Sequence, residues 1–174
     1  MLADRRKLFA IAGGLALVLA GVVWYAGTTS TGTLRVLVKD APAEWAHVNV
    51  TFSEVRVHRA NASEESGWHS LALETTTIDF IELGNLTKVL ALDRVPAGKY
   101  TQIRIVVAKV EGTFADGERV TLTVPDGILK TTTPFDLPGG GEATLTLDFD
   151  LSRSILDNAS GWTFKPVLGS IQVS

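Results

Sequence analysis

The sequence contains no cysteine among its 174 residues. This absence excludes disulfide bonds, thiolate metal sites, cysteine nucleophiles and a lipid-modified N-terminal cysteine. Aromatic residues make up only 7% of the chain, and the formal net charge is −3 with the basic residues scattered. Nucleic-acid binding needs a clustered basic face, so we expect no nucleic-acid partner.

Catalytic motifs are also missing from the sequence. It contains no G-x-S-x-G elbow, no H-E-x-x-H pair, no P-loop and no dinucleotide-binding fingerprint. An enzymatic reading would have to depend on isolated residues. We therefore expect a non-catalytic protein without a cofactor.

A long apolar run is present at the N-terminus. Residues 8–26 read LFAIAGGLALVLAGVVWYA and directly follow Arg5, Arg6 and Lys7. Such a run, at ~1.5 Å per residue, spans roughly 28 Å, which is close to the thickness of a bilayer's hydrocarbon core. Because basic residues stay on the cytoplasmic side, we predict a single-pass membrane protein whose C-terminal domain is extracytoplasmic.

The predicted organisation has four parts: a basic cytoplasmic segment (1–7), a transmembrane anchor (8–26), a tether (27–32) and one β domain (33–174). A cleaved signal peptide is the alternative to an anchor. For cleavage after Ala26 the −3 position would be Trp24, which fits poorly because small residues are needed there. Cleavage within 27–32 remains open.

All four asparagines lie in N-x-S/T triplets without an intervening proline: Asn49, Asn61, Asn85 and Asn158. This triplet is the acceptor pattern for N-glycosylation and indicates surface exposure outside the cytoplasm. Asparagine beside serine or threonine in turns is the simpler explanation for any one triplet. The presence of all four asparagines in such triplets favours an N-glycosylated domain. This agrees with the topology predicted from other residues.

The rest of the chain alternates apolar and polar residues in short segments. Such alternation, with Gly- and Pro-containing turns between segments, predicts an all-β antiparallel sandwich. The segments predicted as strands are 33–39, 47–58, 68–73, 76–83, 99–109, 118–124, 142–151 and a last one within 162–173. We expect a hairpin turn at Asp116-Gly117 and one helical turn at 87–92.

The segment HVNVTFSEVRVHR (47–59) changes phase. Its apolar residues occupy even positions up to Phe52 and odd positions from Val55. Because side chains in a strand alternate with period two, one strand can bury both halves only with an extra residue, a β-bulge near Ser53-Glu54. Asn49 and His58 would then face outward. Two strands joined by a bend are the alternative.

Four blocks carry a family resemblance: TGTLRVLVKDAPAEW, HVNVTFSEVRVHR, VPAGKYTQIRIVV and ATLTLDFDLSRSI. Together they resemble the domain-of-unknown-function 4382 family, which occurs in bacterial and archaeal envelope proteins. The resemblance implies an immunoglobulin-like or transthyretin-like sandwich, with Gly98 in a turn and Tyr100 anchoring the strand that follows. It implies no catalytic residues.

Candidate ligand sites are few. Asp148 and Asp150 share one strand face and could contribute to a Ca²⁺ site, although no D-x-[DN]-x-[DN]-G loop supplies further ligands. Trp68 and Trp162 each follow a sequon-bearing polar loop and could form a sugar-binding platform. The simpler interpretations are that the two aspartates lie on a solvated strand face and that the two indoles pack against the core. The three histidines lie too far apart along the chain to suggest a shared metal.

The sequence thus favours a non-catalytic, glycosylated β-sandwich that is anchored in the cell membrane and has a structural or adhesive role. Its partners would be the membrane, through the N-terminal helix, and envelope glycans or surface proteins. A carbohydrate- or metal-binding module is one alternative. A filament subunit that exchanges the strand around 34–38 through exposed β-edges is another.

Overall fold

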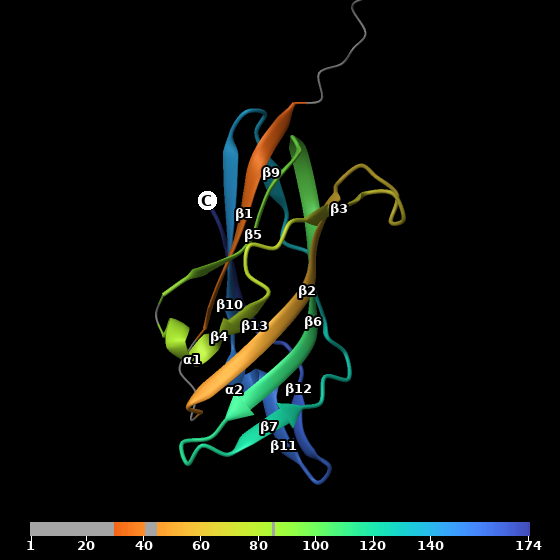
Figure 1. Cartoon of the computed structure of the whole chain (residues 1–174). Coiled ribbons are helices and arrows are strands. Elements are labelled where there is room, and N and C mark those ends of the chain that lie inside the picture. Colours follow the sequence, from red (N-terminus) through yellow and green to blue (C-terminus); the bar gives the residue numbers. More distant parts are fainter. Residues whose placement is uncertain (1–29, 41–44, 85) are drawn as a thin grey trace, which may run out of the picture.

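A computed structural model describes residues 30–40, 45–84 and 86–174. This part of the chain is mostly β-structure, arranged in two larger sheets and one two-stranded ribbon (Figure 1). The predicted anchor at 8–26 lies outside the described residues. Within them, no helix is long and apolar enough to cross a bilayer.

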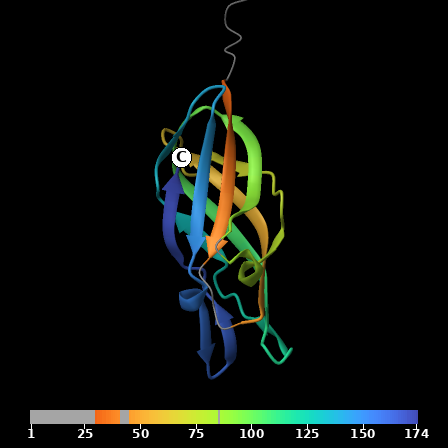
Figure 2. The same cartoon turned by 90° about the vertical axis from the view of Figure 1, so that its left-hand side faces the viewer.

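The first sheet has four strands in the order β13-β10-β1-β5. Their bounds are Leu168–Val173, Glu142–Phe149, Thr31–Asp40 and Lys88–Pro96. Figure 2 shows this sheet in front of the other one. β1 pairs parallel with β10 and antiparallel with β5, so the sheet is mixed and the expectation of purely antiparallel pairing was wrong here.

The position of β1 corrects the predicted end of the tether and bears on the proposed exchange of this strand. The strand begins at Thr31, so the last two residues of the predicted tether pair with Pro96 and Val95 of β5. In addition, β1 is an inner strand, and Leu34, Val36 and Val38 are fully buried. Exchange of this segment between subunits would therefore have to remove an inner strand from its sheet.

The second sheet is built around two long strands, β2 (His47–Arg59) and β6 (Gly98–Thr113). β3 (Trp68–Leu71) and β4 (Thr77–Asp79) pair with β2, whereas β7 (Arg119–Leu122), β8 (Ile128–Thr131) and β9 (Phe135–Leu137) pair with β6. The predicted hairpin turn joins β6 to β7, with Gly117 at a φ of 89°. β11 (Ile155–Asn158) and β12 (Gly161–Phe164) form the separate ribbon.

The predicted bulge in β2 is confirmed, because the register with β6 shifts between Phe52 and Glu54 and leaves Ser53 unpaired. Val50, Phe52 and Val55 are consequently all buried in one continuous strand. One expectation about this strand was wrong. His58 is not exposed but 4% accessible, because Trp68 packs against its ring and its Nε2 lies 3.0 Å from the carbonyl oxygen of Ser63.

Two short helices interrupt the strand pattern. α1 (Phe80–Leu83) follows β4, and α2 (Leu151–Ser154) follows β10. The strand predicted at 76–83 is therefore only three residues long before the chain turns into α1. The helical turn predicted at 87–92 was wrong, since these residues are mostly in β5, and the last predicted segment is divided into β12 and β13 around Pro166.

The apolar faces of the two larger sheets meet in one core. Phe52 of β2 and Phe149 of β10 lie 6.0 Å apart between ring centroids, and Phe80 of α1 lies 5.2 Å from Phe149. Burial of these large rings is expected to dominate the stability of a chain without disulfides. The outer face of the β2–β6 sheet is left for polar side chains.

Candidate functional site

The described sequons lie in different surroundings. Asn61 is exposed in the loop after β2, and Asn158 is exposed at the β11–β12 turn at the opposite end of the molecule (Figure 1). Asn49 is half-buried within β2 and pairs with Asp79 on one side and Glu111 on the other. Asn85 lies outside the described residues. Asn61 and Asn158 are therefore the most accessible of the three described acceptor sites.

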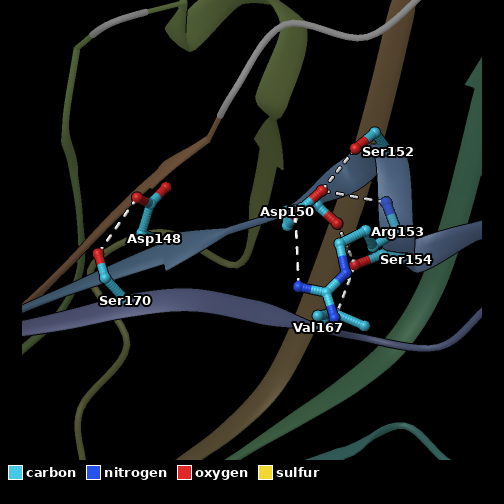
Figure 3. Close-up of polar contacts among 7 residues, drawn as sticks. All are labelled: Asp148, Asp150, Ser152, Arg153, Ser154, Val167 and Ser170. Carbon is cyan, nitrogen blue, oxygen red and sulfur yellow. Dashed lines mark hydrogen bonds and ion pairs between the residues drawn. The ribbon is translucent and has the colours of Figure 1, made fainter.

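The carboxylates of Asp148 and Asp150 have separate partners (Figure 3). Asp148, on β10, lies 3.1 Å from Nζ of Lys39 and accepts a hydrogen bond from Ser170. Asp150 follows the strand and caps α2, accepting from Oγ of Ser152 at 2.6 Å and from the amide of Arg153 at 3.0 Å. The Ser152 hydroxyl is the main reason why the pKa of Asp150 lies below its usual value.

Trp68 and Trp162 lie on β3 and β12, at opposite ends of the molecule (Figure 1), and do not form a common platform. The guanidinium carbon of Arg104 lies 4.5 Å from the ring centroid of Trp68. Trp162 packs edge-on against Trp45 at 4.9 Å. Each indole is half-buried and already has a cationic or aromatic neighbour, which makes it a poor surface for stacking a sugar.

A row of three basic side chains crosses the outer face of the β2–β6 sheet. Arg56 of β2 pairs in register with Arg104 of β6, which pairs with Lys130 of β8. Arg56 forms an ion pair with Glu54, whereas Arg104 and Lys130 have no acidic partner within 4.0 Å among the described residues. The Nε atoms of Arg56 and Arg104 are buried without a hydrogen-bond partner in that part of the chain. We call Arg56, Arg104 and Lys130 the basic row.

A polar hollow of about 260 Å³ lies further along the same sheet, where β2, β6 and β7 run side by side. His47, Asn49, Glu111, Arg119 and Thr121 contribute to its lining. The hollow contains both charge signs and a sequon asparagine. A glycan on Asn49 would start inside it.

His47 also belongs to a cluster with two carboxylates, Asp79 at the end of β4 and Glu82 in α1. One potential ligand atom from each residue lies within 4.8 Å of the other two. Nδ1 of His47 is 2.6 Å from Oδ2 of Asp79. Among the described residues, this is the only group of three or more side chains that could hold a metal ion together.

The family model described as "Domain of unknown function (DUF4382)" matches residues 31–166. The chain belongs to the DUF4382 family. The match begins at the first residue of β1 and ends before β13. No curated protein and no solved structure matches the chain.

Two features of this DUF4382 chain could not be found by reading along the sequence. The residues of the basic row are 48 and 26 positions apart, and those of the His47 cluster are 32 and 3 positions apart. Strand pairing brings the residues of the basic row together, and it brings His47 to Asp79 and Glu82, which are local neighbours. The one local signal is the alternation around Arg56 and Arg104, which places both side chains on the outer face once the register is known.

Proposed function

We propose that this protein is a non-catalytic, N-glycosylated module of the outer cell surface, anchored in the membrane by residues 8–26. The observation that carries the proposal is the uncharged run directly after Arg5, Arg6 and Lys7, followed within a few residues by a folded β domain. Exposed sequons at Asn61 and Asn158 support an extracytoplasmic position.

The fold that we propose is an immunoglobulin-like or transthyretin-like sandwich. Tyr100 supports this assignment, because its hydroxyl donates a 2.6 Å hydrogen bond to the carbonyl oxygen of Pro96, four residues upstream. Such a tyrosine corner is a hallmark of immunoglobulin-like sandwiches. Gly98, at a φ of 142°, makes the turn between the two residues, as the family resemblance implies.

The proposed anchor places one end of the domain against the membrane. Four residues, 27–30, separate the apolar run from β1, and they reach at most ~14 Å when fully extended. The end of the domain where β1 begins would therefore face the bilayer, and the β11–β12 turn with Asn158 would point away from it (Figure 1). An arrangement of this kind suits a module that holds other envelope components near the membrane.

The basic row is the surface that we propose for adhesion. Two of its three cations lack an acidic partner in the described part of the chain, and Arg104 is held in place by Trp68. Guanidinium groups bind carboxylates through paired hydrogen bonds, and the row spans three adjacent strands. This surface fits an acidic polysaccharide better than a neutral sugar, because the indole of Trp68 is already covered.

A pair of double variants tests the adhesive role. We expect R104Q/K130Q to bind immobilised polygalacturonate at least about tenfold more weakly than the unmodified full-length protein. R153Q/K165Q removes the same charge from exposed residues outside the row and should bind as the unmodified protein does. Equal losses in both variants would show that binding follows net charge alone and would reject the basic row as the contact surface.

A further inference from the structure

We propose that His47, Asp79 and Glu82 bind a divalent transition-metal ion of the zinc class where β2, β4 and α1 meet. The inference does not depend on the membrane anchor or on the adhesive role. Three elements each contribute one ligand: His47 starts β2, Asp79 ends β4, and Glu82 lies in α1, which directly follows β4.

The carboxylate of Asp79 is oriented before any ion binds. Its Oδ1 accepts hydrogen bonds from the amides of Val48 and Ile81, both at 3.1 Å. These contacts fix the carboxylate and direct Oδ2 toward Nδ1 of His47. Hydrogen bonds of this kind, which hold a ligand in position, strengthen metal binding at known sites.

The distance between His47 and Asp79 requires only a small movement. In a tetrahedral zinc site with bonds of about 2.0–2.1 Å, neighbouring ligand atoms lie roughly 3.3 Å apart. Nδ1 of His47 and Oδ2 of Asp79 are 2.6 Å apart, so they would separate by less than about 1 Å. The ion would replace the hydrogen that now joins these two atoms.

Glu82 is the residue that distinguishes a metal site from a simple histidine–aspartate pair. Its side chain is exposed and makes no hydrogen bond or ion pair with another described residue. It can therefore turn toward the other two ligands without loss of a hydrogen bond or ion pair to a described residue. A second carboxylate beside an existing pair adds negative charge that a divalent cation would neutralise.

The donor set narrows the class of ion. An imidazole nitrogen with two carboxylate oxygens suits zinc and neighbouring transition metals, whereas Ca²⁺ and Mg²⁺ prefer oxygen ligands throughout. Three protein ligands would leave a fourth position for water, since the side chain of His47 is 47% exposed. The bound ion would join α1 and the short β4 to the start of β2 and raise the melting temperature.

Zinc titration of the full-length, tag-free protein in detergent micelles, after treatment with EDTA, tests the site. We expect one zinc ion per chain by calorimetry and a rise in melting temperature that Mg²⁺ does not reproduce. E82Q should weaken zinc binding about tenfold or more, while its melting temperature without metal stays unchanged. E118Q and H69A are the matched controls, because each removes a similar group outside the cluster, and both should bind zinc normally.

Two results would overturn the proposal. One is the absence of saturable one-to-one binding by the unmodified protein. The other is equal zinc affinity in E82Q and the unmodified protein, which would show that Glu82 is not a ligand.

Discussion

Two aspartates at strand ends show how single residues determine the local fold. Asp79 ends β4 and accepts a hydrogen bond from the amide of Ile81, and Asp150 follows β10 and accepts one from the amide of Arg153. Each carboxylate satisfies a backbone donor that the start of a helix leaves without an internal partner. At both places, the chain therefore passes from a strand into a single helical turn.

At the residue scale, the charge of Asp150 makes stability depend on pH. Its pKa is lowered in the folded protein, chiefly by the Ser152 hydroxyl, so its contribution is present above the ordinary value of 3.8. That contribution is lost as the pH falls through the lowered folded-state pKa. We expect D150N to be less stable than the unmodified protein at pH 7, and the difference to shrink progressively below about pH 4.

Urea unfolding at a series of pH values measures this effect. Asparagine keeps an acceptor for the cap, so the comparison isolates the charge. D157N, at an exposed position of β11, is the matched control and should differ little from the unmodified protein at any pH. A D150N difference that stays constant down to about pH 2.5 would contradict the assignment.

At the element scale, the change of phase in β2 is the most informative feature. Ser53 is skipped in the pairing with β6, and Ala108 is skipped on the opposite strand. In both strands, the buried residues therefore switch between even and odd positions at nearly the same place. A β-bulge bends and twists the strand that contains it, and here β2 and β6 do so together.

Two single-residue deletions test the role of the bulge. Deletion of Ser53 leaves Phe52, Val55 and Val57 on one face, so we expect the domain to fold with a loss of about 1–2 kcal/mol. Deletion of Arg56 turns Val57 outward and reverses every later residue of the strand. We expect it to cost more than about 3 kcal/mol or to prevent folding. Similar unfolding free energies for both deletions would contradict this account of the register.

The sequence predicted the elements in which period-two alternation and one-sided burial agree, notably β1, β2, β6 and β10. It failed at 88–96, where Leu90 and Ala91 are consecutive and both buried. Two adjacent residues can both be buried here because the register with β1 shifts between Val36 and Leu37. In the sequence, this break in the alternation of apolar and polar residues resembled the pattern of a helical turn. The His47 cluster could not be predicted, because His47 meets Asp79 and Glu82 only through the pairing of β2 with β4.

At the scale of the whole molecule, the parallel pairing of β1 with β10 joins the start of the domain to a strand more than 100 residues later. Parallel strands need a long crossover connection, whereas a short turn can join the antiparallel strands of a hairpin. It places the beginning of the domain at one end of the molecule and the β11–β12 turn at the other (Figure 2). The proposed anchor and the sequon at Asn158 would thus lie at opposite ends.

The intact mass of the protein extracted from its native membranes tests the membrane anchor and the glycosylation together. We expect a chain that retains residues 1–26 and carries sugar-sized mass increments, with Asn61 and Asn158 occupied. A chain that retains its N-terminus but has the unmodified mass at all four sequons would contradict glycosylation and remove the main support for an outer-surface position. A chain lacking the first ~26–30 residues would contradict the anchor and indicate signal-peptide cleavage.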